Sequence, residues 1–128
     1  MEYFHKWDDL EAQEHGLPGS LCRIKAITGR NMQLIWARFE PGGEYEMHSH
    51  PHEQFSFMIS GRMLLSVGGQ EREVGPGDIW HAPPGVLHGG KLLGREPVVF
   101  VDIFHPVRED VMAEMRRNRA RRENGGGL

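Results

Sequence analysis

The sequence has only one cysteine, Cys22, so no disulfide can form within the chain. We expect this residue to be a small core residue in a strand, and a chain without internal disulfides agrees with a reducing compartment. No apolar run approaches the roughly 18 residues that a membrane-spanning helix needs. The first residues also lack the basic and apolar regions of a signal peptide. These features predict a cytoplasmic protein with no membrane partner.

An excess of positive charge is missing as well. The 15 lysines and arginines are outnumbered by 18 aspartates and glutamates, which gives a formal net charge of −3. Such a chain has no positive field to attract phosphates, so we expect no nucleic-acid partner. Its 128 residues, 38% of them hydrophobic, are enough for one domain with one core.

Glycine and proline, by contrast, recur at short intervals through the middle of the chain. The turns that they predict fall at residues 41–43, 60–61, 68–69, 75–77, 83–85 and 89–90. The runs between them, most of them rich in β-branched and aromatic residues, lie at 21–28, 32–40, 55–59, 62–67, 79–82 and 98–104. This spacing is typical of an all-β sandwich or barrel. Gly68 and Gly69 predict a tight hairpin, because both positions of a primed two-residue turn need a positive φ.

Alternation along two of these runs predicts which side chains share a face. Side chains of a strand point to opposite faces in turn, so every second residue belongs together. The two sets are Gln54, Ser56 and Met58 in one run, and Phe100, Asp102 and Phe104 in the other. If both sets face the lumen of a barrel, they meet there.

The ends of the chain differ from the middle. We expect residues 1–20 to form an N-terminal arm, 21–106 the barrel, 107–123 a C-terminal helix and 124–128 a disordered tail. In the helix, Val111 and Met115 lie at helical spacing, acidic residues come first and arginines last, as the helix dipole favours. The arm, with Trp7 and Leu10, could join two copies by contributing an apolar surface. A homodimer is the default expectation.

Histidine is the first chemical signal, because three of the eight histidines lie within residues 48–52. His48 and His50, at i and i+2 of an extended segment, place both imidazoles on one side about 7 Å apart, within reach of one metal ion. Gln54 begins the next strand and can add an amide oxygen. His88 follows the turn at 83–85 and is the best candidate for a fourth ligand. Opposite strand parity should turn Glu53 away from the ion.

The spacing of these residues resembles that of the cupin superfamily, over residues 32–104. The first cupin motif, G-x5-H-x-H-x3-E-x6-G, matches at Gly42, His48, His50 and Gly61, with Gln54 where the family usually has glutamate. The second motif, G-x5-P-x-G-x2-H-x3-N, matches at Gly77, Pro83, Gly85 and His88, with Leu92 in place of asparagine. The resemblance implies a double-stranded β-helix of jelly-roll type, here followed by the short C-terminal α-helix. It also implies one divalent metal ion, bound inside by His48, His50, Gln54 and His88.

Glutamine in the ligand set bears on the chemistry. A neutral amide beside three imidazoles leaves the bound ion its full positive charge, which suits a Lewis acid better than an oxidation centre. An iron oxygenase more often has two histidines and a carboxylate, although three-histidine oxygenases occur among cupins. Nickel, zinc, manganese and iron all stay open as the metal.

Asp102 is the main candidate for proton transfer. A carboxyl group between Phe100 and Phe104 lies in apolar surroundings, which raise its pKa. Residues 101–110 also resemble the closing strand, D-x-F-x-P-x-R-E-D, of small cupins in pectin and alginate breakdown. Those proteins open the ring of 4,5-unsaturated uronates and also carry glutamine in the metal set. The resemblance implies that Asp102 is the catalytic acid/base, that Phe104 lines the sugar pocket and that Arg108 holds the substrate carboxylate.

A second carboxylate contact could come from Arg38, if that side chain faces inward together with Trp36. The expected function is therefore that of a metal-dependent enzyme that opens or isomerises the ring of a small acidic carbohydrate, most simply an unsaturated uronate. Two alternatives use the same residues: a dioxygenase with iron(II), and a non-catalytic cupin that binds a small molecule. The chain has no helix-turn-helix segment through which a sensor would act, which weakens the second alternative.

Overall fold

A computed structural model describes residues 2–16 and 21–123 of the chain. Its elements in chain order are the 3-10 turn η1 (Trp7–Asp9), β1 (Gln13–Glu14), β2 (Cys22–Thr28), β3 (Gln33–Phe39), β4 (Tyr45–His48), β5 (Glu53–Ser60), β6 (Arg62–Val67), β7 (Gln70–Val74), β8 (Ile79–Ala82), β9 (His88–Leu93), β10 (Val98–His105) and α1 (Glu109–Glu123). The six runs predicted from the sequence match strands to within two residues at each end. The tail predicted at 124–128 lies outside the described residues.

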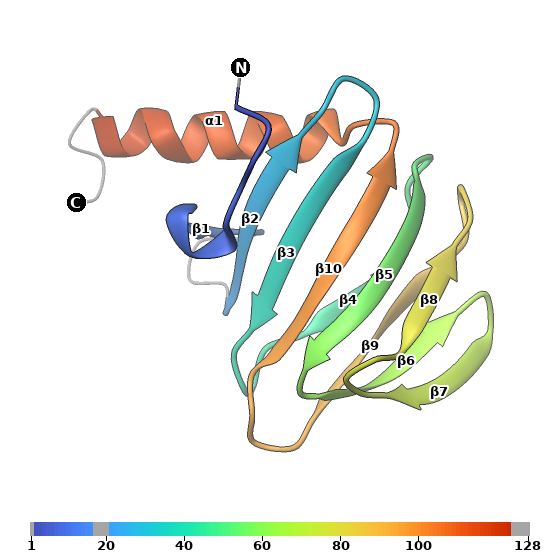
Figure 1. The fold of residues 1–128 in the computed structure, drawn as a ribbon. Helices are drawn as coiled ribbons and strands as arrows, with labels where there is room; N and C mark the ends of the chain where they lie inside the picture. Colours follow the sequence, from blue (N-terminus) through green and yellow to red (C-terminus); the bar gives the residue numbers. More distant parts are fainter. Residues whose placement is uncertain (1, 17–20, 124–128) are drawn as a thin grey trace.

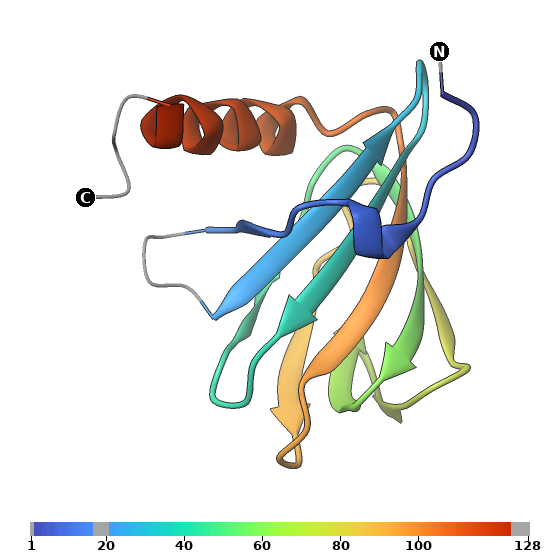
Figure 2. The ribbon, with the colours of Figure 1, turned by 60° about the vertical axis from the view of Figure 1, so that its left-hand side comes forward.

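The strands form two antiparallel sheets that face each other (Figure 1). One sheet has the order β1-β2-β3-β10-β5-β8 and the other the order β4-β9-β6-β7. Figure 2 shows the two layers closing around a common interior. This arrangement confirms the expected double-stranded β-helix with a C-terminal α-helix. None of the described helices is long and apolar enough to cross a membrane.

The interior is built by side chains of one parity from each strand. β10 lies between β3 and β5, and its register sets Phe104 opposite Gln54, Asp102 opposite Ser56, and Phe100 opposite Met58. Both predicted sets are buried, which confirms that they share one face. The core around them includes Cys22, Ile24, Ile35, Ala37, Phe39, Tyr45, Met63, Leu65, Val74, Trp80 and Val98. Burial in β2 agrees with the expectation for Cys22.

The described part of the N-terminal segment and the C-terminal helix contact each other. β1 pairs with β2, so the predicted arm at 1–20 supplies an edge strand of the larger sheet. α1 lies beside this strand: the Asn118 side chain donates to the Glu14 carbonyl over 3.0 Å, and the Glu114 carboxylate accepts from the Gly16 amide over 2.7 Å. Val111 is buried beneath the first turn of the helix. The helix begins at the barrel with its first turn and then runs away from it past β2 (Figure 1).

The hairpin predicted at Gly68 and Gly69 joins β6 to β7, and both residues have positive φ angles, 57° and 83°. Gly61, in the turn between β5 and β6, has nearly the same φ, 82°, but different surroundings. A Cβ atom on Gly61 would lie 2.5 Å from the Pro97 carbonyl oxygen and 2.8 Å from the Val98 Cα atom, whereas a Cβ on Gly69 meets nothing within 4 Å. Of Gly61 and Gly69, only Gly61 is therefore required by close packing as well as by its positive φ.

The two glycines form a matched pair for a stability measurement. We expect Gly69→Ala to lower the free energy of unfolding by about 1–2 kcal/mol, the cost of placing alanine at a positive φ. Gly61→Ala carries the same cost plus backbone overpacking of about 1–3 kcal/mol, so it should be clearly less stable. Urea unfolding followed by circular dichroism checks both. Equal losses in the two variants would contradict the packing argument.

Candidate metal centre

Three imidazoles from separate segments of the chain lie together in one cluster. His48 ends β4, His50 follows it in the loop before β5, and His88 begins β9. Pairing of β4 with β9 sets His48 directly opposite His88, with the ring centroids 4.2 Å apart. One ligand atom from each of the three rings lies within 4.8 Å of the others. The sequence prediction that His88 joins the pair from a distant part of the chain agrees with this geometry.

The backbone fixes which nitrogen of each ring faces the cluster. Nδ1 is hydrogen-bonded to a main-chain carbonyl in all three rings: His48 to Glu46 over 2.8 Å, His50 to His52 over 3.0 Å, and His88 to Val86 over 2.9 Å. A carbonyl oxygen only accepts, so each Nδ1 carries the proton. Each Nε2 of the neutral ring then keeps a free lone pair, the arrangement typical of metal-binding histidines.

Burial keeps these rings neutral. It lowers the pKa of His48 and of His50, and it lowers the pKa of His88 to about 4. The His88 side chain is fully buried, and its Nε2 atom has no hydrogen-bond partner. A buried polar atom without a partner is costly, so the arrangement requires some compensating contact. A metal ion supplies such a contact, and neutral imidazole is the form that binds one.

Gln54 adds an amide oxygen beside these three imidazoles. Its amide nitrogen donates to the Ser56 hydroxyl over 2.8 Å and to the Asp102 carboxyl over 3.1 Å. These two bonds turn the amide oxygen toward the histidines, where it lies 3.0 Å from His50 Nε2. Because the His50 proton is on Nδ1, His50 Nε2 and the Gln54 amide oxygen are both acceptors and cannot hydrogen-bond to each other. A cation bound by both atoms would satisfy both lone pairs. The donors His48, His50, Gln54 and His88 thus fit a divalent transition metal.

Asp102 lies directly behind this donor set. Burial raises its pKa to about 7, although hydrogen bonds from Ser56 and Gln54 and the positive charge of Arg108 act in the opposite direction. The Ser56 hydroxyl donates to Asp102 Oδ1 over 2.5 Å, and the Gln54 amide donates to the same oxygen. A buried carboxyl group with a pKa near neutrality is suited to both giving and taking a proton.

A pocket of about 530 Å³ opens beside the donor set and is lined by His48, Gln54, Asp102, Phe104 and Arg108. Its other walls are mostly apolar and include Ile24, Ile35, Ala37, Phe39, Phe100 and, from α1, Val111. The Arg108 guanidinium lies 5.1 Å from the Phe104 ring centroid. The Asp110 carboxylate accepts hydrogen bonds from Nε and Nη2 of Arg108 over 3.0 and 2.6 Å and orients that side chain. The pocket therefore combines an apolar wall, the buried Asp102 carboxyl group and one arginine, and Glu44 and Glu46 also line it.

The suggested substrate contact of Arg38, which depended on an inward orientation, is wrong. In β3 the side chains of Ile35, Ala37 and Phe39 are buried in the interior, so those of Trp36 and Arg38 point outward. Arg38 is exposed and donates to the Glu40 carboxylate over 2.7 Å, and it does not line the pocket. Strand alternation predicts that Trp36 and Arg38 share a face, but it does not say whether that face is the inner or the outer one. A large apolar side chain such as Trp36 does not by itself identify the inner face.

Glu53, by contrast, faces outward as predicted. On the outer surface of β5 and β8 its carboxylate pairs with His81 over 2.8 Å. Both side chains are exposed, so neither belongs to the donor set.

Two site residues were not assigned a role from the sequence. Ser56 was placed in the lumen by parity, but its bond to Asp102 depends on the register between β5 and β10. Tyr45 is buried with its ring centroid 5.4 Å from that of His48, and it also lines the pocket. Its position three residues before His48 in the same strand was the only available signal.

Comparison with known proteins supports this description. A family model described as "Cupin domain" matches residues 35–104 of the chain, which include all four donors. The pectin degradation protein KdgF of Dickeya dadantii (strain 3937) is 26% identical over 108 residues, which cover 83% of this chain and 90% of that relative.

Solved structures agree with the fold. An RmlC-like cupin from Shewanella frigidimarina NCIMB 400 superposes with a TM-score of 0.77 and 25% identity, covering 87% of this chain and 96% of that one. KdgF from Halomonas sp. superposes with a TM-score of 0.76 and 24% identity, covering 87% of this chain and 99% of that one. Likeness at this level of identity establishes the architecture.

Two histidines of opposite orientation provide a test of the donor set. We expect His88→Ala to reduce the metal content of the purified protein at least tenfold, because it removes one of three converging imidazoles. His81→Ala, on the outer face, should leave the metal content unchanged. Elemental analysis by mass spectrometry, with a melting curve to confirm folding, gives the answer. Full metal retention in folded His88→Ala would exclude this centre.

Proposed function

The chain belongs to the cupin domain family, and on that basis we propose that it is a metal-dependent enzyme that opens the ring of a 4,5-unsaturated uronate. The observation that carries the proposal is the hydrogen-bonded set of Gln54, Ser56 and Asp102. In this set the buried Asp102 carboxyl group lies next to the three-imidazole cluster and lines the pocket beside it. The name of the D. dadantii relative, a pectin degradation protein, supports a uronate as the substrate.

We assign His48, His50, Gln54 and His88 as the metal ligands, with nickel, zinc, manganese or iron as the candidate ions, because imidazole suits nickel, zinc and iron and a carbonyl-type oxygen suits manganese. When bound, the ion supplies Lewis-acid polarisation of substrate oxygens. Since Gln54 is neutral, the protein's own ligands remove none of the ion's charge. Three imidazoles and an amide therefore favour polarisation of an anionic substrate over electron transfer.

Asp102 is the residue that moves the proton. The bonds from Ser56 and Gln54 both go to Oδ1, so the transferable proton belongs on Oδ2. The carboxyl group gives this proton to C4 of the substrate, and as a carboxylate it accepts a proton from the water that adds to C5. The C5 hydroxyl then passes its proton to the ring oxygen as the bond between C5 and that oxygen breaks, which leaves a ketone at C5 and an open chain with a hydrated aldehyde at C1. A buried position excludes bulk water from this exchange.

Arg108 and Phe104 position the substrate. The guanidinium is oriented by Asp110 and is only 14% exposed, which strengthens its attraction for a carboxylate compared with a fully solvated arginine. The Phe104 ring forms an apolar wall between Arg108 and the donor set, with its centroid 5.5 Å from that of His50. Arg108 would bind the carboxylate and Phe104 would contact the ring. A sugar ring that carries one carboxylate is a uronate.

An assay of ring opening with Asp102→Ala tests the assignment. We expect kcat to fall at least about 100-fold, the usual loss when a general acid/base is removed, while the metal content stays that of the wild type. The loss of absorbance of the conjugated enol ether reports the reaction. Unchanged turnover in Asp102→Ala would remove this residue from the mechanism. A wild-type protein that consumes oxygen and leaves the uronate intact would instead be an iron(II) dioxygenase.

Arg108 and Arg38 form a second matched pair, since one lines the pocket and the other lies outside it. We expect Arg108→Ala to raise KM by about 10- to 100-fold, because a charge-assisted hydrogen bond to a carboxylate contributes about 1.5–3 kcal/mol. Arg38→Ala should leave both kcat and KM within twofold of the wild type. Steady-state kinetics on one substrate preparation separate the two. An equal effect of both substitutions would mean that the arginines act through net charge only.

A further inference from the structure

The pocket is larger than a single uronate ring requires. Its volume of about 530 Å³ lies in the range of pockets that hold drug-sized ligands, which are roughly twice as large as one sugar ring. The proposed ring opening uses the metal ligands, Asp102, Phe104 and Arg108, which are only part of the lining. The rest of the lining is mostly apolar. A substrate made of one uronate ring would leave this apolar part of the pocket without a ligand group.

Strand register separates the polar part of the pocket from the apolar part. Across the larger sheet, Asp102 of β10 lies opposite Ser56 of β5. The adjacent inward row contains Phe100, Ala37 and Ile24, from β10, β3 and β2, and all three line the pocket. Adjacent inward rows are two residues, or roughly 7 Å, apart along a strand. The apolar part therefore begins one row beyond Asp102.

Ala37 makes room in this row. It lies between Ile24 and Phe100, and it has the smallest side chain on the inner face of β3. Tyr45 of β4 lines the same pocket, and its ring centroid lies 5.5 Å from that of Phe39 and 5.3 Å from that of Phe100. We call Ile24, Ala37, Phe39, Tyr45 and Phe100 the apolar compartment. Three aromatic rings in its walls suit a flat apolar group.

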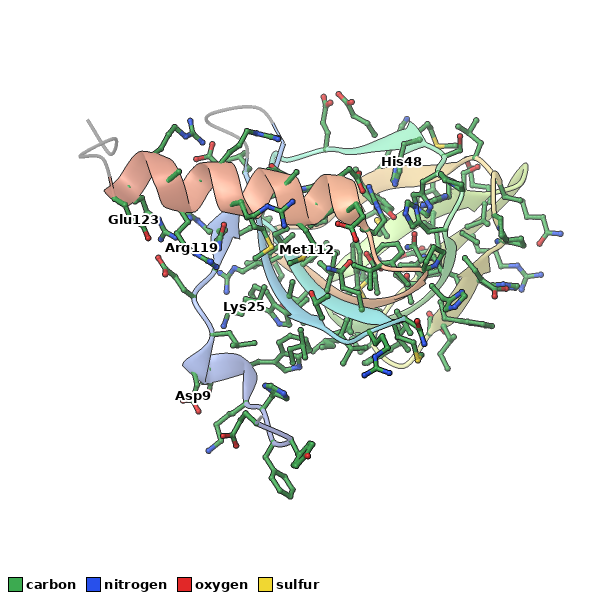
Figure 3. The ribbon with its side chains drawn as sticks, turned by 90° about the horizontal axis from the view of Figure 1, so that it is seen from above. Asp9, Lys25, His48, Met112, Arg119 and Glu123 are labelled. Atoms are coloured by element: carbon green, nitrogen blue, oxygen red, sulfur yellow. The ribbon has the colours of Figure 1, made fainter. Side chains whose placement is uncertain are left out.

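The apolar compartment and the metal centre belong to one cavity. Figure 3 looks down on the barrel and shows Lys25 of β2 outside the larger sheet and His48 on its inner side. Lys25 Nζ lies 4.7 Å from the ring centroid of Trp36, which also points outward. Ile24, the neighbour of Lys25, therefore faces the side on which the imidazoles lie, and both Ile24 and His48 line the pocket.

The rim of the pocket on the β4 side carries negative charge. Glu44 and Glu46 both line the pocket and are exposed. On the β2 side the rim is formed by Leu21, which is 46% exposed. Two carboxylates repel a ligand group of the same sign, so the rim disfavours a second uronate beside the first. A group that extends from the apolar compartment to the rim should therefore be uncharged.

We infer, building on the proposed function, that the substrate is a 4,5-unsaturated uronide whose C1 oxygen carries an uncharged aglycone with an aromatic or similarly apolar ring. The aglycone occupies the apolar compartment while the uronate ring lies at Asp102 and Arg108. C1 is joined to C5 through the ring oxygen alone. An aglycone on C1 therefore begins within one row spacing of the carbon that reacts.

Ring opening of such a uronide releases the aglycone. A proton adds to C4 and the hydroxyl group of water adds to C5, as in the free sugar. When the bond between C5 and the ring oxygen breaks, that oxygen takes the proton of the C5 hydroxyl and becomes a hydroxyl group on C1. C1 is then a hemiacetal, since it carries this hydroxyl and the aglycone oxygen. The C1 hydroxyl passes its proton to the aglycone oxygen as the bond between them and C1 breaks. One water is consumed, an aldehyde and a free alcohol form, and no oxidant is needed.

Three unsaturated uronides test the inference on the wild-type protein: the free sugar, its 4-nitrophenyl glycoside, and a disaccharide with a second uronate on C1. Chromatography of the remaining substrate follows ring opening, and absorbance follows the released 4-nitrophenol. We expect kcat/KM for the nitrophenyl glycoside to exceed that for the disaccharide at least about tenfold, because the aryl ring fills an apolar pocket and the second uronate meets two carboxylates. Each ring opened should release one nitrophenol.

Ala37→Leu fills the apolar compartment, and Arg38→Leu is the matched control, since it introduces the same side chain at the next position on the outer face of β3. We expect Ala37→Leu to lower the ratio of kcat/KM for the nitrophenyl glycoside to that for the free sugar at least about tenfold. Arg38→Leu should leave this ratio unchanged. Glu44→Gln, on the exposed rim, should raise kcat/KM for the disaccharide several-fold without affecting the core.

The possible failures can be told apart. A wild-type protein that opens the free sugar but leaves the nitrophenyl glycoside intact would overturn the inference while the proposed function stands. A protein that opens none of the three compounds would contradict the proposed function, and the inference with it. An unchanged ratio in folded Ala37→Leu, or a disaccharide that reacts as fast as the nitrophenyl glycoside, would also overturn the inference, since the aglycone would then bind elsewhere.

Discussion

The pairing of β10 with β5 is the constraint on which the whole site depends. It sets three consecutive inward positions of one strand against three of the other, and the middle pair is Asp102 and Ser56. The Gln54 amide then reaches across to Asp102 from the next inward position. Because side chains alternate, a shift of one residue would send the aspartate and the glutamine to opposite faces. The hydrophobic residues on either side of Asp102 resist such a shift, so the core itself maintains the register of the polar groups.

This arrangement divides two tasks between the ends of one amide group. The nitrogen of Gln54 binds to the acid, and its oxygen faces the imidazoles. Glutamate at this position could not do both, because a carboxylate has no hydrogen to donate to Asp102. Two carboxylates so close together would also raise each other's pKa. The departure from the usual cupin motif is thus linked to the presence of Asp102 at the facing position of β10.

Much of the architecture followed from local patterns in the sequence. Turn residues predicted most strand limits, parity predicted which face Asp102 and Gln54 share, and motif spacing brought His88 to the other histidines. Longer-range contacts could not be read in this way. Arg38 was misjudged because both faces of β3 carry large apolar side chains, and alternation alone does not tell inside from outside. Contacts such as that of Glu114 with Gly16 join residues 98 positions apart in the sequence, and no local signal indicates them.

One buried valine connects the C-terminal helix to the pocket. Val111 forms part of the pocket wall, yet it belongs to no strand and makes no contribution to the register of either sheet. Its size sets part of the pocket wall, and because Val111 also belongs to the hydrophobic core, a substitution there changes core packing as well. Natural variation in the helix thus offers a way to reshape the cavity for larger or smaller acids, separate from any change in the metal or in the proton donor. Substitutions in a helix outside both sheets can therefore change which acids the pocket accepts.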